Sequence, residues 1–567
     1  MTQISTALLG SALDYIKWDP NIETRREIQL LLDKKDGAAL KQRLGARLQF
    51  GTAGLRGPMG GGYSRMNDLV ILQTSQGLIK YLLETVGEGA KGAGLVIGYD
   101  HRKFGSLSSL NFARMCAAVF LRQGFQVYLL EDFVATPLVA FAVRKLGCCC
   151  GVMVTASHNP KRDNGFKVHW GSGSQIIPPH DAGIAAAIDA NLAPWQEEYD
   201  CDNVLSHPLA KDVTDEIADA YYAEIVKLLA VPRTSPEGAT APRPRLAYTA
   251  MHGVGRKWIQ RAFRAAGLSD KEEPTLLSVV PSQAEPDADF PTVIFPNPEE
   301  KGALDEAMRW ASAQGCPVII ANDPDADRLA AAELVSPGQW RVFTGNEIGV
   351  LLGHWLIRQF KASAGEEVNP QSCFNLPALP AVLCRPCQQR PAVLASVVSS
   401  RMLSRIAAAE NIQYFDTLTG FKWLGNKAAS LQVRPLALSL SCSLHSSLIP
   451  HLFFSLDRPR EPRCFSHTKK PSATAAARWS TTRTACLPPS SSPTWSTSST
   501  PPARRSPRNW PRFTRHTGAA PHTTATSFAT TPPSQTAFLS AFVKSSAWPR
   551  SKRPWMAAPL SRFVAAP

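Results

Sequence analysis

The chain has 567 residues, of which 44% are hydrophobic, and is long enough for three or four domains with full cores. Its net charge of +15 suggests nucleic-acid binding, but residues 431–567 hold 18 Lys and Arg against two acids, whereas residues 1–430 hold 43 against 44. Because the basic excess lies entirely in the last part of the chain, the predicted globular part is neutral, and we expect no nucleic-acid partner for it.

Segments for membrane insertion or secretion are not expected. The longest apolar run, 436–454, is interrupted by Pro450 and two histidines, and no basic stretch followed by an apolar core opens the chain. The twelve scattered cysteines indicate thiols in a reducing cytosol. Cys148–Cys150 lie in a strand-like run, and Cys384 and Cys387 form a lone Cys-x-x-Cys without a second pair, so neither group predicts a metal site. We expect a cytoplasmic, monomeric protein without a membrane partner.

The first part of the chain predicts a parallel α/β unit. An amphipathic helical stretch over 25–48 leads to the glycine-rich loop Phe50-Gly-Thr-Ala-Gly-Leu-Arg-Gly57. Strand-like and helix-like patterns then alternate as strand 95–99, helix 108–124, strand 126–130, helix 137–146 and strand 151–155. This βαβαβ order is typical of a parallel sheet with crossover helices.

Two further copies of the pattern follow. The second consists of strand 245–250, helix 257–266, strand 275–280, helix 304–313 and strand 317–321, and the weaker third of helix 347–360, strand 392–398 and helix 402–409. We therefore predict an α/β fold of three tandem domains with mixed or parallel sheets and crossover helices. The predicted domains are 1–208, 209–333 and 334–430.

The string Thr155-Ala-Ser-His-Asn-Pro160 places Ser157 on a turn after a predicted strand. A serine in such a turn is most often a turn former or a helix cap. The nearby His158 and Lys167 favour a second interpretation, because a phosphorylated serine requires positive neighbours. No Gly-x-Ser-x-Gly elbow surrounds Ser157, which argues against a hydrolase nucleophile.

The string Asp323-Pro-Asp-Ala-Asp-Arg328 offers three carboxylates at alternate positions. A calcium loop would require glycine and glutamate where this chain has Arg328 and Leu334, so an acidic turn or a magnesium site remains. Three carboxylates suit Mg²⁺ when a phosphate oxygen completes the ligand set. Since the sequence has no nucleotide-binding phosphate loop, the two strings together predict phosphoryl transfer between hydroxyl groups.

In this order the motifs resemble those of the α-D-phosphohexomutases, and within them the eukaryotic phosphoglucomutase/phosphopentomutase branch. The resemblance covers approximately residues 18–429. Besides the three strings quoted above, it is carried by Gly98-Tyr-Asp-His-Arg102, Asn164-Gly-Phe-Lys167, Tyr248-Thr-Ala-Met-His-Gly-Val-Gly255, Phe295-Pro-Asn-Pro-Glu-Glu-Lys-Gly302 and Thr417-Leu-Thr-Gly-Phe-Lys-Trp423.

The resemblance also implies the roles of individual residues. Ser157 would be the phosphoserine, Arg56 and Lys167 would transfer protons or stabilise charge, and His158 would be catalytic. One Mg²⁺ per chain would be held by Ser157 and the carboxylates of Asp323, Asp325 and Asp327. The residues implied to bind substrate are Arg56, Arg102 and Arg328, together with Thr419, Gly420 and Lys422 of the sugar-recognition loop.

The activity that the resemblance implies is that of a phosphosugar mutase, an isomerase that acts on small-molecule phosphosugars. It would interconvert glucose 1-phosphate and 6-phosphate, or (deoxy)ribose 1-phosphate and 5-phosphate, through a sugar bisphosphate intermediate and activator. The sequence does not choose hexose over pentose. Two alternatives stay open, namely an inactive truncated gene product and a protein that binds a partner through its basic tail.

The tail, residues 431–567, differs from the rest of the chain. It holds one glycine against 36 in the first 430 residues, and 19 of the 45 prolines, and no helical or strand period persists in it. We therefore predict disorder. Because the fourth domain of the family, with its Arg-Thr-Ser-Gly-Thr-Glu-Pro-like phosphate loop, is absent from the sequence, we interpret the tail as the product of intron retention and frameshift, and the insertion 372–390 as translated intron.

Overall fold

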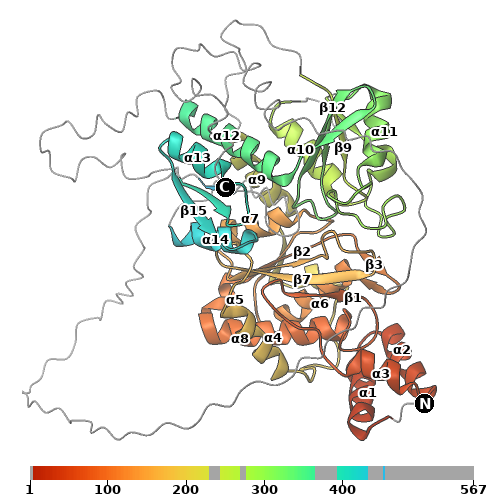
Figure 1. The fold of residues 1–567 in the computed structure, drawn as a ribbon. Helices are drawn as coiled ribbons and strands as arrows, with labels where there is room; N and C mark the ends of the chain where they lie inside the picture. The colour runs from red at the N-terminus through yellow and green to blue at the C-terminus, as the bar shows by residue number, and fades with distance from the viewer. Residues whose placement is uncertain (1–3, 229–242, 269–275, 364–391, 432–450, 454–567) are drawn as a thin grey trace, which may run out of the picture. The chain divides into compact units, whose positions relative to one another are not determined.

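A computed structural model describes residues 4–228, 243–268, 276–363, 392–431 and 451–453 (Figure 1). The insertion 372–390, the Cys384–Cys387 pair and, except for residues 431 and 451–453, the tail lie outside these ranges. Within them, three α/β units follow one another, each with its own sheet, which confirms the predicted fold class. No helix in the described ranges combines the length and the apolar character needed to cross a membrane.

The first unit contains a six-stranded sheet in the order β1-β7-β6-β2-β5-β8. Strands β6, β2, β5 and β8 are mutually parallel, whereas β7 pairs antiparallel with both β6 and β1. Its strands are β1 (Leu55–Pro58), β2 (Leu95–Tyr99), β5 (Val127–Leu129), β6 (Cys150–Val154), β7 (Asp163–Trp170) and β8 (Ala210–Asp212). The main helices are α4 (Asp68–Val86), α6 (Ser109–Arg122), α7 (Thr136–Leu146) and α8 (His180–Asp189), with the short elements α5 (Gly89–Ala93), β3 (Lys103–Phe104) and β4 (Leu107–Ser108) between them.

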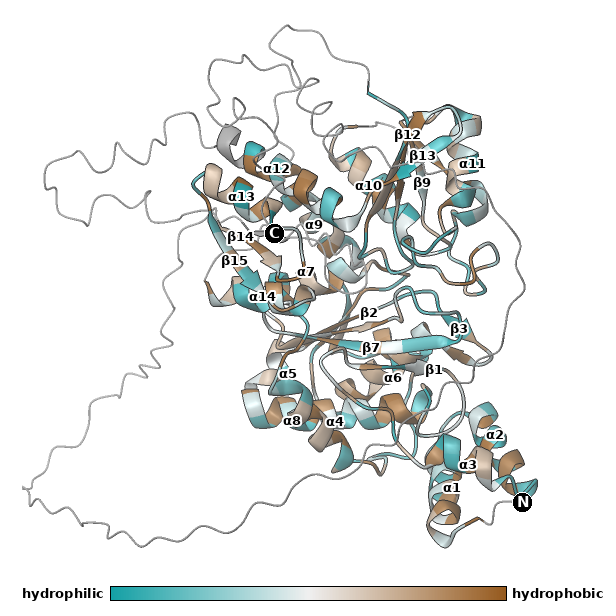
Figure 2. Cartoon of the chain, viewed as in Figure 1, coloured by the Kyte–Doolittle hydropathy of each residue, from teal (hydrophilic) through white to brown (hydrophobic). Residues whose placement is uncertain are grey.

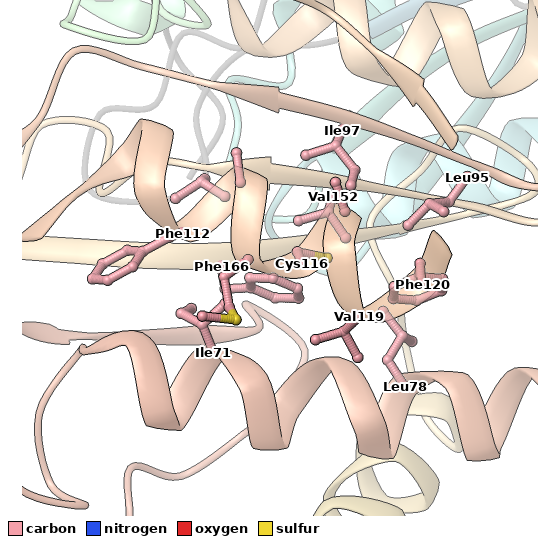
Figure 3. Close-up of a cluster of buried hydrophobic side chains, with 14 of the residues drawn as sticks. Ile71, Leu78, Leu95, Ile97, Phe112, Cys116, Val119, Phe120, Val152 and Phe166 are labelled. Carbon is pink, nitrogen blue, oxygen red and sulfur yellow. The ribbon is translucent and has the colours of Figure 1, made fainter. Parts of the chain in front are cut away.

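The two faces of this sheet are covered by different helices. Side chains at alternate positions of β2 and β6, such as Leu95, Ile97 and Val152, pack with α4 and α6 in the largest buried cluster (Figure 3). The opposite face receives α7, which approaches closely because Gly98 and Gly151 carry no side chain there. A Cβ atom on Gly98 would lie 2.6 Å from a methyl carbon of α7, so these glycines set the position of that helix.

The cysteine run lies at the edge of this core. Only Cys150 belongs to β6, whereas Cys148 and Cys149 precede the strand, so the prediction that all three lie within it was wrong for two of them. All three are free thiols. Burial raises the pKa of the Cys148 thiol to about 12, which keeps it protonated and unreactive at neutral pH.

The second unit is built around a five-stranded sheet in the order β10-β9-β11-β12-β13. It contains β9 (Leu246–Thr249), β10 (Leu277–Val279), β11 (Val318–Ala321), β12 (Ala330–Ser336) and β13 (Gln339–Val342), with α9 (Thr214–Leu228), α10 (Gly255–Ala265) and α11 (Asp305–Gln314). Helices beside the sheets carry both hydrophilic and hydrophobic residues, as Figure 2 shows, which is the pattern of helices with one buried face.

Two predicted domain boundaries separate residues that belong to one sheet. The boundary at 208 precedes β8, which pairs with β5 of the first sheet. The boundary at 333 cuts β12, which forms an antiparallel hairpin with β13 around Ser336-Pro-Gly-Gln339. This hairpin was not predicted, because only alternating strands and helices were expected there. The available signal was the Pro-Gly turn.

The third unit begins with α12 (Gly345–Ser363) and has a three-stranded sheet, β15-β14-β16. Its remaining elements are β14 (Ala392–Ser396), α13 (Met402–Ala409), β15 (Gln413–Thr417), α14 (Phe421–Ser430) and β16 (His451–Phe453). Strand β16 lies in the predicted disordered tail, yet it pairs antiparallel with β14, so the prediction was wrong for these three residues. A strand pairs through its backbone, which explains why side-chain composition did not reveal it.

Three helices precede the first sheet: α1 (Thr6–Trp18), α2 (Ile22–Asp33) and α3 (Gly37–Leu44). The continuous helix predicted over 25–48 is therefore two helices. The break occurs where Lys35 adopts a left-handed backbone (φ 52°) and the Asp36 side chain accepts a hydrogen bond from the Ala39 amide. An aspartate in this position caps a new helix instead of continuing the old one.

Candidate active site

Ser157 occupies a buried turn just beyond the carboxyl end of β6. Its backbone is left-handed (φ 53°), a costly conformation for a residue with a side chain, and its amide donates to Thr155 Oγ1 at 2.8 Å. The hydroxyl oxygen lies 2.7 Å from Asp323 Oδ2 and 3.2 Å from His158 Nδ1. The turn therefore directs the hydroxyl of Ser157 towards the aspartate loop of the second unit.

Arg102, for which the resemblance implies substrate binding, supports the loop that carries Ser157. Its side chain is completely buried, and its guanidinium donates to the backbone carbonyls of Pro160 and Asp163 through Nη1 and of Ser157 and Asn159 through Nη2, at 2.6–3.0 Å. A guanidinium has five donors in a fixed planar fork, and four are used here to hold one loop. Sequence spacing cannot show which backbone atoms a buried arginine meets.

The three aspartates lie just beyond the carboxyl end of β11. Ala326 between them has a left-handed backbone (φ 52°), which produces a tight turn. One oxygen from each of Asp323, Asp325 and Asp327 lies within 4.8 Å of the others. The motif thus gathers three carboxylates at one point, close to Ser157.

Two side chains of the first unit hold the aspartate loop. Thr136, the first residue of α7, donates through Oγ1 to Asp325 Oδ2 at 2.7 Å and through its amide to the Asp325 carbonyl at 3.0 Å. Lys167 Nζ donates to Asp325 Oδ2 at 2.7 Å and to Asp327 Oδ2 at 3.3 Å. The loop is therefore fixed by a helix start and by a buried ammonium on β7.

The electrostatics of the cluster shift the pKa values of the three carboxylates in different directions. Burial, reinforced by the other two carboxylates, raises the pKa of Asp323 well above its ordinary value, and burial with Asp325 nearby raises that of Asp327. Burial alone would also raise the pKa of Asp325, but the Lys167 ammonium holds it below its ordinary value. Although burial opposes the charge of Lys167, the two carboxylates raise its pKa, so it stays protonated.

The hydrogen bonds of His158 define its tautomer. Arg328 Nη2 lies 3.3 Å from His158 Nε2, and because a guanidinium only donates, Nε2 must accept. Burial and the charges of Arg328 and Arg56 lower the pKa of His158 to about 3, so the ring is neutral and Nδ1 carries the hydrogen. Nδ1–H then donates to Ser157 Oγ, while the Ser157 hydroxyl donates to Asp323.

The other predicted residues surround this centre. Arg56 lies on β1 next to β7, and its Nη1 donates to Asn159 Oδ1 at 3.2 Å. Arg328 donates through its amide to Asp323 Oδ1 at 3.0 Å and through Nη1 to Asn297 Oδ1 at 3.3 Å. Both arginines therefore border the Ser157 turn.

The predicted sugar loop lies at the start of α14. Gly420, with a φ of 102°, precedes the first helical residue, and Thr419 precedes it in turn. Lys422 Nζ donates to Thr52 Oγ1 at 2.5 Å, in the glycine-rich loop that leads into β1 and Arg56. The structure thus brings Lys422 to the first unit.

Two residues of the site were missed by the sequence analysis. Thr136 is 189 positions from Asp325, and its Thr-Pro signal indicates a helix start without naming a partner. Asn297 was quoted in a motif but given no role, although its side chain accepts from Arg328.

The donor set of the aspartate loop fits a hard divalent cation. Among the described residues this is the single group of His, Cys, Asp and Glu side chains close enough to share a metal, and all of its ligands are carboxylates. Asp325 Oδ1 is buried and accepts no hydrogen bond from any described residue. A buried carboxylate oxygen without a donor is the type of atom that a cation would satisfy.

Comparison with known proteins gives matches along most of the described chain. Models for phosphoglucomutase/phosphomannomutase alpha/beta/alpha domains I, II and III match residues 47–194, 219–335 and 378–437 in that order. Mouse (Mus musculus) phosphopentomutase is 41% identical over 420 residues, which cover 74% of this chain and 63% of the mouse protein.

Two further relatives match a region of the same length. A probable phosphoribomutase of Schizosaccharomyces pombe is 43% identical over 74% of this chain and 65% of its own length. Human (Homo sapiens) glucose 1,6-bisphosphate synthase is 38% identical over 74% of this chain and 63% of its own length. The chain therefore matches slightly less than two thirds of the length of these relatives.

Proposed function

The chain belongs to the phosphoglucomutase/phosphomannomutase family, and from that membership we propose that it is a phosphosugar mutase with Ser157 as its phosphoserine. The observation that carries the proposal is the convergence of the Ser157 hydroxyl, Lys167 and three carboxylates across two units. Phosphoryl transfer depends mainly on positioning and on neutralising charge, and these groups supply both.

In the proposed half-reaction, the bond between Ser157 Oγ and phosphorus breaks as a bond forms from a sugar hydroxyl oxygen to phosphorus. The proton of the sugar hydroxyl ends on Ser157 Oγ, so atoms and charge balance. The sugar bisphosphate then reorients, and the reverse transfer of its other phosphoryl group regenerates phosphorylated Ser157. No nucleotide is needed, because the phosphoester energy is conserved in each exchange.

The residues around Ser157 have distinct parts in this proposal. The His158 Nδ1–H donates to Oγ and stabilises negative charge there as phosphorus leaves. Asp323 Oδ2 accepts the hydroxyl proton of dephosphorylated Ser157 in a hydrogen bond. Lys167, whose pKa is raised by its two carboxylate partners, acts through its fixed charge and not as a base.

We assign the metal of the proposal to Asp323, Asp325 and Asp327, with a phosphate oxygen on Ser157 completing the set, and Mg²⁺ is the cation that such ligands suit. When bound, it would neutralise charge on the phosphoryl group. Arg56, Arg328, Thr419, Gly420 and Lys422 are proposed to bind the substrate.

The proposed substrates are (deoxy)ribose 1-phosphate and 5-phosphate, or glucose 1-phosphate and 6-phosphate, with the corresponding bisphosphate as intermediate and activator. The relatives support these substrates, since two are pentose or ribose phosphomutases and one is a glucose 1,6-bisphosphate synthase. A cytoplasmic location and a monomeric state belong to the same proposal. An inactive product that retains the phosphoserine site is the second candidate.

The test separates phosphorylation from turnover. The full chain is incubated with glucose 1,6-bisphosphate and Mg²⁺, Ser157 phosphorylation is measured by mass spectrometry, and conversion of ribose 1-phosphate and glucose 1-phosphate is followed. We expect Ser157→Ala to abolish the phosphopeptide, whereas Ser206→Ala, at an exposed position, leaves it unchanged. Phosphorylation without turnover favours the second candidate, and an unmodified Ser157 rejects both.

A further inference from the structure

Arg102, a buried side chain of the first unit, binds the backbone of the loop that presents Ser157 and also contacts a residue of the second unit. Arg102 uses both terminal nitrogens to bind four carbonyls of residues 157–163, and its Nε lies 3.5 Å from Asp100 Oδ2. Asp100 Oδ1 in turn accepts from the Ser109 hydroxyl at 2.5 Å. Four of the five guanidinium donors therefore bond to this loop, and the fifth, on Nε, makes an ion pair with Asp100 without a hydrogen bond. The face of the guanidinium is left for another partner.

That face is covered by Phe290. The Arg102 Cζ lies 5.2 Å from the centre of the Phe290 ring, within the range of a cation–π contact, and the His101 ring packs edge-on at 5.4 Å. Phe290 is only 3% exposed although it lies in an irregular segment between β10 and α11. The Phe290 side chain, which comes from a loop, is thus buried against Arg102, the residue that binds the backbone of the Ser157 turn.

The Phe290 segment is itself fixed to the second sheet. The Asp287 amide donates to the His252 carbonyl at 2.9 Å, and the Phe290 amide donates to the Asp287 carbonyl at 3.2 Å. His252 follows β9, and its Nε2 lies 2.8 Å from Thr292 Oγ1. Phe290 holds a left-handed backbone (φ 48°), which is uncommon for an aromatic residue and requires such anchoring.

We propose that Phe290 is a positioning residue that links the seating of the second unit to the geometry of the Ser157 turn, by packing on the Arg102 guanidinium. This inference rests on the proposed function, since it concerns how Ser157 is presented to the phosphoryl group. The carboxylates and the serine lie on different units, so a contact that aligns both would keep the Ser157 hydroxyl at its distance from Asp323.

The test uses Phe290→Leu in the full chain, because leucine keeps an apolar side chain but removes the ring face. We expect hydrogen exchange in the peptide covering residues 157–163 to become about tenfold faster. We also expect a kcat five- to twentyfold lower, with a KM for the sugar phosphate changed less than twofold, because the turn and not the substrate contacts is altered. Phe141→Leu is the matched control, since Phe141 pairs with Tyr221 at 5.4 Å, between α7 and α9.

The outcomes decide the inference independently of turnover. Faster exchange confined to residues 157–163 in Phe290→Leu but absent in Phe141→Leu supports it, even in a chain without mutase activity. Unchanged exchange, or equal losses of protection throughout the first unit in both variants, overturns it. In an active chain, Phe290→Leu should have less effect when combined with Arg102→Lys, and full additivity of the two losses would also overturn it.

Discussion

Replacing Lys167 by methionine should be strongly destabilising, and a divalent cation should restore part of the loss. The Lys167 side chain is 6% exposed, and its ammonium lies 2.7 Å from Asp325 Oδ2 and 3.3 Å from Asp327 Oδ2. Removing one partner of a buried ion pair leaves uncompensated charge and costs about 3–5 kcal/mol. We place the loss near 3 kcal/mol, because the carboxylates can relieve repulsion by taking up a proton.

The assay is urea unfolding followed by tryptophan fluorescence, with EDTA and with saturating Mg²⁺. A cation at 100 times its dissociation constant adds about 2.7 kcal/mol to the folded state, so K167M should recover most of its stability in Mg²⁺. The control is Lys91→Met, which removes an exposed pair with Glu88 and should change stability by less than about 0.5 kcal/mol. A loss below about 1 kcal/mol in EDTA would refute the reasoning about buried charge.

Burial raises the pKa of Asp68 to about 6, so the folded state binds its proton more tightly than the unfolded chain, and stability falls as pH rises from about 4 to 6. Asp68 lies in the first turn of α4, where a negative charge is favourable, and this offsets part of the gain from removing the charge. D68N should therefore stabilise the folded protein by about 2 kcal/mol at pH 8 and by less at pH 5. An equal gain at both pH values would contradict this. T136V removes the hydroxyl that donates to Asp325 and should weaken Mg²⁺ binding about tenfold in calorimetry, and unchanged affinity would count against a supporting role. G98A introduces a methyl group 2.6 Å from α7 and should cost about 1–3 kcal/mol, whereas G92A, with open space around it, should be neutral or stabilising.

The sequence predicted the elements whose apolar periods are unbroken. Strand β2 and helix α13 have their predicted bounds, because a buried strand and an amphipathic helix each carry a complete pattern. The split between α2 and α3 was missed, because the helical pattern of apolar residues continues across it, while the single Asp36 cap starts a new helix. The β12–β13 hairpin was missed because its turn was not weighed against the alternating α/β pattern.

At the site, short sequence motifs identified the reacting groups but not the residues that hold them in place. Ser157 and the three aspartates could be found because their chemistry is local to each motif. Thr136 and the role of Arg102 depend on contacts between segments distant in the chain, which no local pattern encodes. The tautomer of His158 likewise depends on Arg328, 170 positions away.

The hydrogen bonds between Thr136 and Asp325 have a consequence for dissecting this molecule. Each of the first two units contributes part of the site. Ser157, Lys167 and Thr136 lie on the first unit and the three carboxylates on the second. A fragment ending between the two sheets would retain a serine without its acceptor, and the complementary fragment would retain acids without their counter-charge. We expect neither fragment to work alone, so a split pair that regains phosphorylation only on mixing could serve as a reporter of fragment association.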